Sequence, residues 1–304
     1  MKWLPNTSLT GIADLDRQDI DQLMAAAGQM AGARAPAMAP LAGRIVATLF
    51  YEASTRTRLS FEAAALRLGA HVVSVADATG SSSVAKGESL ADTVRIVSAY
   101  ADAIVLRHPQ EGAAQEAARA LGDRIPVING GDGAGEHPTQ ALTDAYTLHQ
   151  HFGRLDGLTV TFVGDLRYGR TVHSLAALLG SYALRAVQLV APEGLDAPGG
   201  LAGSLGTAPV IHISSLAEAA ATTDVLYMTR IQHERLPAGA TPPGPLRVDR
   251  AVLDALPASS VILHPLPRKD ELPTLVDDDP RAIYFQQAAN GVPMRMALLT
   301  HAIG

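Results

Sequence analysis

Short apolar runs alternate with longer amphipathic segments along the whole chain, and this alternation restricts the fold more than any other feature of the sequence. The apolar runs lack polar alternation, which is typical of parallel strands buried on both faces. Alternating strands and helices predict an α/β protein with parallel sheets covered by helices. The predicted strands are 45–50, 72–75, 103–106, 126–128, 158–163, 186–190, 225–228 and 261–263, and the predicted helices are 17–30, 56–68, 88–100, 111–121, 138–151, 170–179, 214–221, 249–256 and 292–303.

A Gly-rich stretch near Gly135 divides this alternating pattern into two parts. A chain of 304 residues is long enough for two domains of ordinary size. We therefore expect two domains, each with a parallel sheet covered by helices. Two stretches rich in Pro and Gly, 207–209 and 237–245, are predicted to be exposed loops, and the second is predicted to be mobile.

The composition limits the classes of function. The chain has no cysteine, which excludes disulfides, thiolate nucleophiles and cysteine metal sites. The net charge of -6 argues against a general nucleic-acid or membrane-surface binder. The N-terminal stretch is too polar for a signal peptide, and no apolar run is long enough to cross a bilayer. We therefore expect a cytoplasmic protein with neither nucleic acid nor membrane as a partner.

A polar cluster, STRTR at 54–58, follows the first apolar strand and opens a helix. A helix start exposes unpaired backbone N–H groups and the positive end of the helix dipole. The Ser and Thr hydroxyls add donors, and Arg56 adds a bidentate fork for oxyanions, so the cluster suits a phosphate. The alternative is a plain N-cap by Ser54 or Thr55, with both arginines on a solvated face.

Two further polar clusters follow other predicted strands. Arg107 comes directly after the strand at 103–106, and His137 and Gln140 lie where a Gly-rich turn leads into a helix. Ligand sites in open α/β sheets cluster at the carboxyl ends of strands. A lone histidine is more often structural than catalytic, but polar clusters at three equivalent strand ends indicate a ligand site.

Several motifs together resemble the aspartate and ornithine carbamoyltransferase family, and the resemblance covers the whole chain. FYEASTRTRLSFE at 50–62 resembles the family's carbamoyl phosphate signature, and RHP at 107–109, HPTQ at 137–140 and HPLPR at 264–268 follow in the family's order. The stretches 81–93, 164–175, 227–236 and 284–291 resemble the aspartate branch specifically. Pro265 also favours that branch, because the ornithine branch has a cysteine there.

The resemblance implies transfer of the carbamoyl group from carbamoyl phosphate to the amine of L-aspartate, the committed step of de novo pyrimidine synthesis. Neither a metal nor a cofactor is expected. It also implies a carbamoyl phosphate-binding domain of residues 1–136 with the C-terminal helix 289–304, and an aspartate-binding domain of residues 137–288. In family members the Leu266–Pro267 peptide bond is cis.

The chemistry indicates what the site must supply. Attack on the carbamoyl carbon places negative charge on the carbonyl oxygen, so catalysis needs an oxyanion stabiliser, a phosphate clamp and positioning. The departing phosphate can accept the amine proton, so no protein base is required. By resemblance, the phosphate is bound by Ser54, Thr55, Arg56, Thr57 and Arg107, the carbonyl oxygen by Thr57, Arg107 and His137, and the carbamoyl amine by Gln140 and the backbone carbonyls of Pro265 and Leu266.

The second substrate implied by the resemblance is a dicarboxylate. Arg170 opens a helix after the strand at 158–163, and Arg230 and Gln232 follow the strand at 225–228. Two arginines at neighbouring strand ends are what two carboxylates require. The resemblance assigns the carboxylates to Arg170 and Arg230, with Gln232 and Lys86 assisting. The alternative is that both arginines lie in surface loops.

The polar stretch TGSSSVAKGE at 79–88 has the composition of a solvated, mobile loop. In the family this loop enters the active site of the neighbouring subunit and supplies a serine and a catalytic lysine. Here Ser82 and Lys86 match best, although Ser81 and Ser83 leave the serine open. The implied active unit is a homotrimer with shared sites, which regulatory chains or a dihydroorotase could join.

Three other functions compete with this interpretation. A carbamoyltransferase for ornithine, putrescine or an acylated amino acid would need a carboxylate or a less cationic pocket near Arg230. A scaffold subunit without catalysis would lack a catalytic residue, whereas Arg56, Arg107 and His137 are all present. A dinucleotide-binding oxidoreductase is suggested by VTFVGDLRYGR at 160–170, which lacks the GxGxxG pattern.

Overall fold

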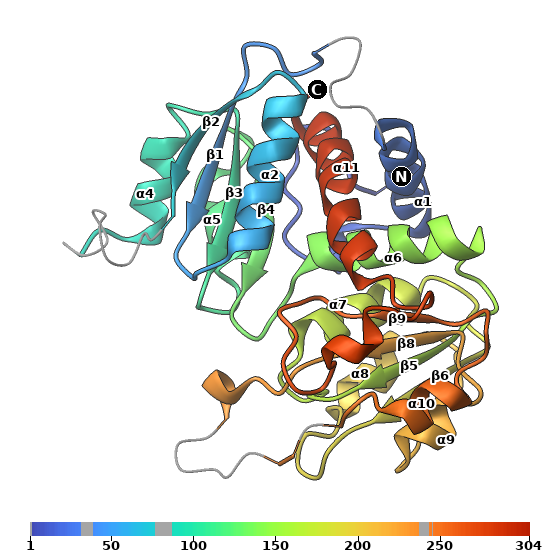
Figure 1. Cartoon of the computed structure of the whole chain (residues 1–304). Helices are drawn as coiled ribbons and strands as arrows, with labels where there is room; N and C mark the ends of the chain where they lie inside the picture. Colours follow the sequence, from blue (N-terminus) through green and yellow to red (C-terminus); the bar gives the residue numbers. More distant parts are fainter. Residues whose placement is uncertain (1, 32–38, 77–86, 237–242, 245) are drawn as a thin grey trace. The chain divides into compact units, whose positions relative to one another are not determined.

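A computed structural model describes residues 2–31, 39–76, 87–236, 243–244 and 246–304. The chain forms two compact units (Figure 1): unit 1 comprises Met1–Tyr146 and Asn290–Gly304, and unit 2 comprises Thr147–Ala289. The division between them falls within α6 (Pro138–Phe152), whereas the domain boundary predicted from the sequence lies just before this helix. The assignment of a binding function to each predicted domain stays a prediction.

Unit 1 contains a four-stranded parallel sheet in the order β2-β1-β3-β4. Its strands alternate with helices in sequence, and this is the pattern that the apolar runs predict. The elements are α1 (Arg17–Met30), β1 (Ile45–Phe50), α2 (Thr55–Arg67), β2 (His71–Val75), α4 (Leu90–Val97), β3 (Ala103–His108), α5 (Ala113–Leu121), β4 (Val127–Asp132), the first part of α6 and most of α11 (Tyr284–Ile303).

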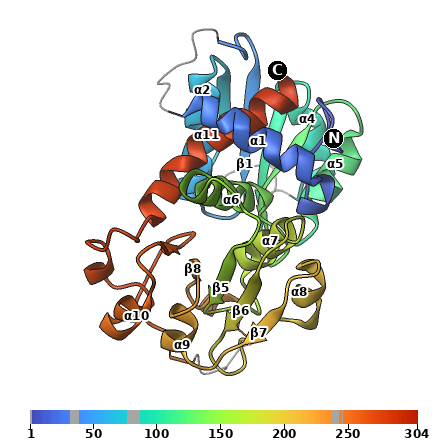
Figure 2. The same cartoon turned by 90° about the vertical axis from the view of Figure 1, so that its right-hand side faces the viewer.

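Helices cover both faces of this sheet. In α5, Ala117 and Leu121 lie one turn apart on the buried face and, with Val94 of α4, pack against Ile104 and Leu106 of β3. Figures 1 and 2 show α1 and α11 side by side in unit 1, and Figure 1 shows them on the other side of the sheet from α4 and α5. The strands β1, β3 and β4 are therefore buried, and the carboxyl ends of the strands are the place where polar loops can gather.

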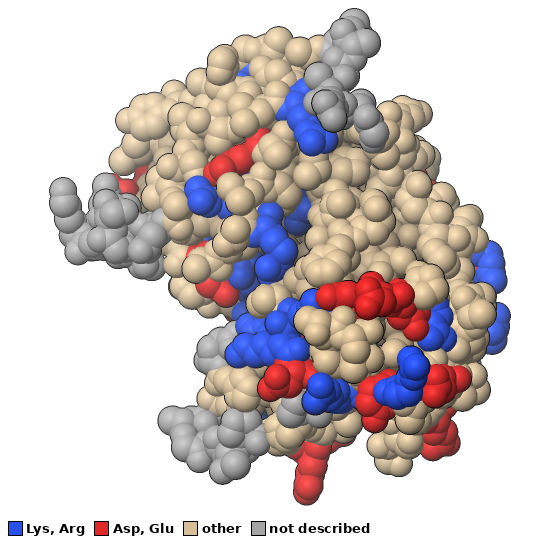
Figure 3. All heavy atoms as spheres, in the orientation of Figure 1, with Lys and Arg blue, Asp and Glu red and all other residues tan. Residues whose placement is uncertain are grey.

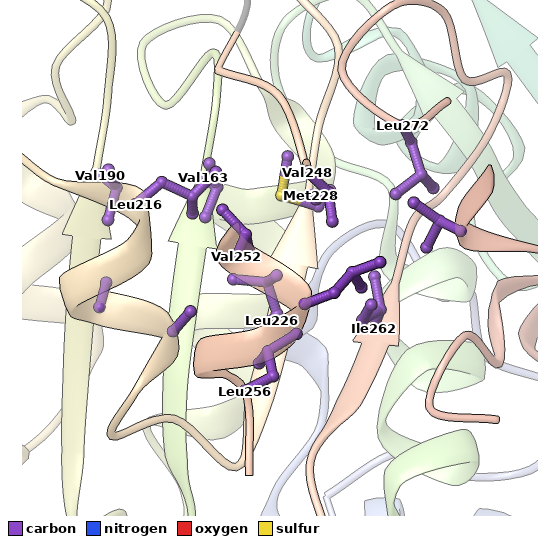
Figure 4. Packing of buried hydrophobic residues seen from close by; sticks show 14 of the residues in the cluster. Val163, Val190, Leu216, Leu226, Met228, Val248, Val252, Leu256, Ile262 and Leu272 are labelled. Carbon is purple, nitrogen blue, oxygen red and sulfur yellow. The ribbon is translucent and has the colours of Figure 1, made fainter. Parts of the chain in front are cut away.

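Unit 2 contains a five-stranded parallel sheet in the order β7-β6-β5-β8-β9. One face packs on α9 and α10 through a cluster of aliphatic side chains that includes Val163, Leu226 and Ile262 from the strands and Leu216 and Val252 from the helices (Figure 4). The elements of this unit are β5 (Thr159–Val163), α7 (Arg170–Leu179), β6 (Ala186–Val190), α8 (Gly199–Ser204), β7 (Val210–His212), α9 (Leu216–Ala220), β8 (Val225–Met228), α10 (Arg250–Ala255) and β9 (Val261–Leu263).

The predicted fold class, two parallel sheets covered by helices, is confirmed, and the structure adds elements that the prediction lacked. The Gly-rich α8 and the three-residue β7 were not predicted, because one has poor helix propensity and the other is too short for a periodic signal. The last helix starts at Tyr284 and continues through Pro293, so the stretch at 284–291 is helical.

The surface carries charges of both signs. On the face shown in Figure 3, basic and acidic side chains lie close to one another over each unit. Within the described ranges, no helix is long and apolar enough to cross a membrane.

The core of unit 2 provides a stability test. Leu226→Ala is expected to lower the free energy of unfolding by about 2–5 kcal/mol, because it leaves a cavity among fully buried aliphatic side chains. The control Ile211→Ala, in β7 of the same sheet, truncates a side chain that is 44% exposed, and its cost should stay below about 1 kcal/mol. Urea unfolding followed by circular dichroism measures both, and equal losses would contradict this description of the core.

Candidate functional site

The carboxyl ends of three neighbouring strands in unit 1 lead into the residues predicted to bind carbamoyl phosphate. α2 follows β1, Arg107 is the penultimate residue of β3, and α6 follows β4. Phe50, the last residue of β1, pairs with Arg107, and β3 pairs in turn with β4. The three polar clusters therefore lie at one edge of one sheet, as the sequence predicted. Arg107 belongs to its strand, whereas the sequence placed it just after the strand.

The start of α2 is arranged differently from an ordinary capped helix. Ser54 occupies the N-cap position with an extended backbone, but its side chain makes no capping hydrogen bond to any residue that the structure describes. The N-cap interpretation therefore does not account for the Ser54 hydroxyl. Arg58 is directed toward β2 instead, because its guanidinium donates to Glu62 (3.4 Å) and to the Ser74 hydroxyl (3.4 Å).

Arg107 is almost fully buried and is held by two acceptors. Its Nη2 donates to Glu52 Oε1 at 3.1 Å, and its Nη1 donates to the carbonyl oxygen of Gly130 at 3.3 Å. A buried guanidinium needs such partners, because an unpaired buried charge is costly. Sequence analysis missed Glu52, although its place inside the 50–62 motif was an available signal.

Thr57 and His137 meet although 80 residues separate them in the chain. The Thr57 hydroxyl lies 3.5 Å from His137 Nε2, and the Thr139 hydroxyl lies 3.5 Å from His137 Nδ1. Thr57 and His137 are both buried. One turn further along α6, Gln140 Nε2 donates to Asp144 Oδ1 at 2.7 Å. Hydroxyl, imidazole and amide groups thus follow one another at this edge of the sheet.

In unit 2, the predicted carboxylate ligands follow two neighbouring strands. Arg170 begins α7 after β5, Arg230 and Gln232 follow β8, and Val163 of β5 pairs with Met228 of β8. The side chain of Arg170 is buried, whereas that of Arg230 is half-buried. The arginines are therefore anchored at strand ends, which argues against the alternative of two loosely held surface arginines.

A single buried carboxylate joins the two loops that carry these residues. Asp165 Oδ1 accepts from the backbone N–H of Tyr168 (2.9 Å), and Asp165 Oδ2 accepts from the backbone N–H of Gln232 (3.1 Å). The Gln232 amide also donates to the carbonyl oxygen of Tyr168 at 2.7 Å. Gly164 must be glycine, because it has a φ of +111° and a Cβ there would lie 2.2 Å from the Thr229 carbonyl oxygen. Sequence analysis did not identify Asp165.

The HPLPR stretch forms a loop after β9, and hydrogen bonds of the His264 side chain hold this loop. The backbone N–H of Leu266 donates to His264 Nδ1 (2.7 Å), so the N–H of this ring lies on Nε2 and donates to Glu271 Oε1 (3.0 Å). Burial raises the pKa of Glu271, but hydrogen bonds from His264 and from the backbone together lower it by more than burial raises it. The pKa of Glu271 therefore lies below its ordinary value of 4.5. The Leu266–Pro267 bond is cis, as the resemblance implies.

Some predicted site residues lie outside the described residues. These are Ser82 and Lys86, together with the neighbouring Ser81 and Ser83, and most of the predicted mobile loop at 237–245.

Two family models match the chain, one for each half. "Aspartate/ornithine carbamoyltransferase, carbamoyl-P binding domain" matches residues 7–150, and "Aspartate/ornithine carbamoyltransferase, Asp/Orn binding domain" matches residues 156–302. The chain therefore belongs to the aspartate/ornithine carbamoyltransferase family, and the predicted family is confirmed.

The relatives narrow this class to one branch. The chain is 47% identical over 300 residues to the aspartate carbamoyltransferase catalytic subunit of Methanospirillum hungatei, covering 97% of this chain and 99% of that one. It is 45% identical to the same subunit of Thermoplasma acidophilum, covering 99% of each chain. Aspartate transcarbamoylase from Trypanosoma cruzi, crystallised with carbamoyl aspartate and phosphate, has a TM-score of 0.90 and 40% identity, covering 99% of this chain and 97% of that one. All three carry the name of the aspartate branch, as predicted.

The His264–Glu271 pair predicts a specific dependence of stability on pH. Because the pKa of Glu271 is lower in the folded chain, the pair stabilises the fold above the unfolded pKa, and this stability is lost as the pH falls through the folded pKa. Glu271→Gln should therefore lower the melting temperature at neutral pH and flatten its decline below about pH 5. The control Glu218→Gln, at an exposed position of α9, should retain the wild-type decline. An unchanged decline in Glu271→Gln would contradict the assignment.

Proposed function

We propose that this chain transfers the carbamoyl group of carbamoyl phosphate to the amino group of L-aspartate, giving N-carbamoyl-L-aspartate and phosphate. The observation that carries the proposal is the group of oxyanion-binding residues at the carboxyl edge of the unit 1 sheet, with buried Thr57 close to His137 and buried Arg107 on the neighbouring strand. We further propose that the reaction serves de novo pyrimidine synthesis, as the resemblance implies, and that it takes place in the cytoplasm, as the composition favours.

Carbamoyl phosphate is assigned to the carboxyl edge of unit 1. The N–H groups at the start of α2 and the positive end of its dipole suit the phosphate. The Ser54 hydroxyl, which does not cap the helix, adds a donor. The proposed phosphate ligands are Ser54, Thr55, Arg56, Thr57 and Arg107.

Thr57, Arg107 and His137 are proposed to stabilise the carbonyl oxygen. Negative charge develops on this oxygen when the amine attacks, and donors that are already fixed stabilise it without a further cost of reorganisation. The two acceptors of Arg107 hold its guanidinium in place before the substrate arrives. The carbamoyl amine is assigned to Gln140 and to the carbonyl oxygens of Pro265 and Leu266. As the carbon–oxygen bond to phosphate breaks, the departing phosphate accepts the amine proton.

L-Aspartate is assigned to the loops of unit 2. Arg170 and Arg230 would bind its two carboxylates, assisted by Gln232 and by Lys86. The Asp165 carboxylate supports this assignment, because it joins the loop after β5 to the loop after β8 and so fixes the spacing of the two arginines. A monocarboxylate would leave one of these cations without a counter-charge, and a diamine would leave both.

A kinetic assay tests the proposed function and the aspartate site together. Purified protein should form N-carbamoyl-L-aspartate, and Arg230→Ala should raise the KM for aspartate by about ten- to a hundredfold, the cost of one charge-assisted hydrogen-bonded contact. The KM for carbamoyl phosphate should change little. Arg250→Ala, at a side chain that is 83% exposed in α10, is the matched control. No product from wild type would refute the function, and an unchanged aspartate KM in Arg230→Ala would move the carboxylate site elsewhere.

We also propose that the active unit is a homotrimer in which Ser82 and Lys86 reach the site of the neighbouring subunit. β2 is one of the two outer strands of its sheet, and Val73 on β2 and Tyr100 after α4 have exposed side chains. Edge strands and exposed apolar groups are places where chains associate. In sequence, β2 and α4 flank the stretch 77–86 that contains Ser82 and Lys86, which supports an interface here.

Subunit mixing tests the shared site. Lys86→Ala chains and Arg56→Ala chains should each be nearly inactive, whereas hybrid trimers should regain about one-third of wild-type activity, because one site in each hybrid has both residues. Mixing Arg56→Ala with Arg107→Ala chains is the control and should recover nothing, because one chain supplies both residues of each site. Absence of recovery in the first mixture would argue against shared sites.

A further inference from the structure

We propose that Asp144 is a positioning residue that fixes the Gln140 amide with its oxygen toward carbamoyl phosphate, and that Arg295 keeps Asp144 in its charged, acceptor-only form. This arrangement would make the site select an acyl phosphate whose acyl group ends in an NH₂. The inference rests on the proposed function, because it assumes that Gln140 meets the carbamoyl amine.

The contact between Gln140 and Asp144 determines the orientation of the amide. The two residues lie one turn apart on α6, Gln140 Nε2 donates to Asp144 Oδ1 at 2.7 Å, and Asp144 is fully buried. An ionised carboxylate has only acceptors, so the amide nitrogen must face it. The Gln140 oxygen consequently points away from Asp144.

This orientation matches the chemistry of the substrate. The carbamoyl group ends in an NH₂ that can only donate in this contact, so it needs an acceptor, and the Gln140 oxygen is one. A flipped amide would oppose donor to donor. Acetyl phosphate has a methyl group in place of this NH₂, and it gains nothing from the Gln140 oxygen. The orientation of the Gln140 amide therefore distinguishes carbamoyl phosphate from acetyl phosphate.

Arg295 provides the charge that a buried carboxylate requires. It is 3% exposed on α11, and its guanidinium carbon lies 5.1 Å from the centre of the Phe61 ring. α11 accommodates this group at Gly291, where a Cβ would lie 2.2 Å from Arg295 Nη1 and 3.9 Å from Thr143 of α6. Burial lowers the pKa of Arg295 to about 10, against a rise from the charge of Asp144, so Arg295 is a cation at neutral pH.

The positive charge of Arg295 matters because Asp144 would otherwise be protonated. A buried carboxylate without a counter-charge takes up a proton. Protonated Asp144 could donate to the Gln140 oxygen and allow the amide to flip. Arg295 therefore acts on the substrate through two other side chains and without contacting it.

Donor selectivity tests this chain of contacts. The readout is the ratio of kcat/KM for carbamoyl phosphate to kcat/KM for acetyl phosphate, each at saturating aspartate. Asp144→Asn offers Gln140 both a donor and an acceptor, and should lower the ratio about tenfold, the value of one lost hydrogen bond. The control is Asp102→Asn, which changes a carboxylate that accepts from Ile45 N–H (2.8 Å) and Arg44 (2.9 Å) in the same unit. This control should keep the wild-type ratio even if stability falls.

The outcomes separate positioning from structure and from the proposed function. A lower ratio in Asp144→Asn with an unchanged ratio in Asp102→Asn supports the proposal. Equal losses with both donors overturn it, because they mark a purely structural role. If Asp144→Asn does not fold, Arg295→Gln, which removes the positive charge, takes its place: a lower ratio supports the proposal and an unchanged ratio overturns it. Wild type that does not carbamoylate aspartate would instead refute the proposed function itself.

Discussion

Parallel strand pairing is the constraint on which the rest of this structure depends. When strands run in parallel, their carboxyl ends reach the same edge of the sheet, and the loops that follow them meet there. In unit 1 this brings together residues that are far apart in sequence, such as Thr57 and His137. In unit 2, the pairing of β5 with β8 does the same for the loops that contain Arg170 and Arg230. The covering helices bury the central strands of each sheet, such as β1 and β5, which leaves the carboxyl ends of the strands for chemistry.

Buried charged groups then hold the side chains and loops that the sheets bring together. Arg107 is held by Glu52, and the His264 ring is held by Glu271. Each ion removed from water is costly unless it is paired or hydrogen-bonded, so the loss of either partner of such a pair destabilises the fold. Their effect is to restrict side chains and loops to one arrangement. A site that stabilises charge in a transition state gains from such fixed groups, because they need not reorganise when the charge appears.

Much of the fold could be predicted, because the strong signals were local. The strands Ile45–Phe50, Ala186–Val190 and Val225–Met228 coincide with the predicted apolar runs. The start of α11 was missed because Gly291 and Pro293 resemble a helix boundary, whereas tertiary packing overrides their propensity. Candidate ligands were found through motifs and strand ends. Their supporting residues, Asp165 and Asp144, were not found, because a sequence shows where carboxylates occur but not which groups they face.

The hydrogen bonds of Asp165 have a consequence for how this family could diversify. Both of its oxygens accept from main-chain N–H groups, at Tyr168 and at Gln232, and every residue except proline supplies such a group. These two contacts are thus independent of the side chains displayed at positions 168 and 232. Mutations at these positions could alter the preferred amine acceptor while the backbone kept its course. A single ancestral scaffold could in this way give rise to enzymes for differently charged amino acids, with little refolding at each evolutionary step.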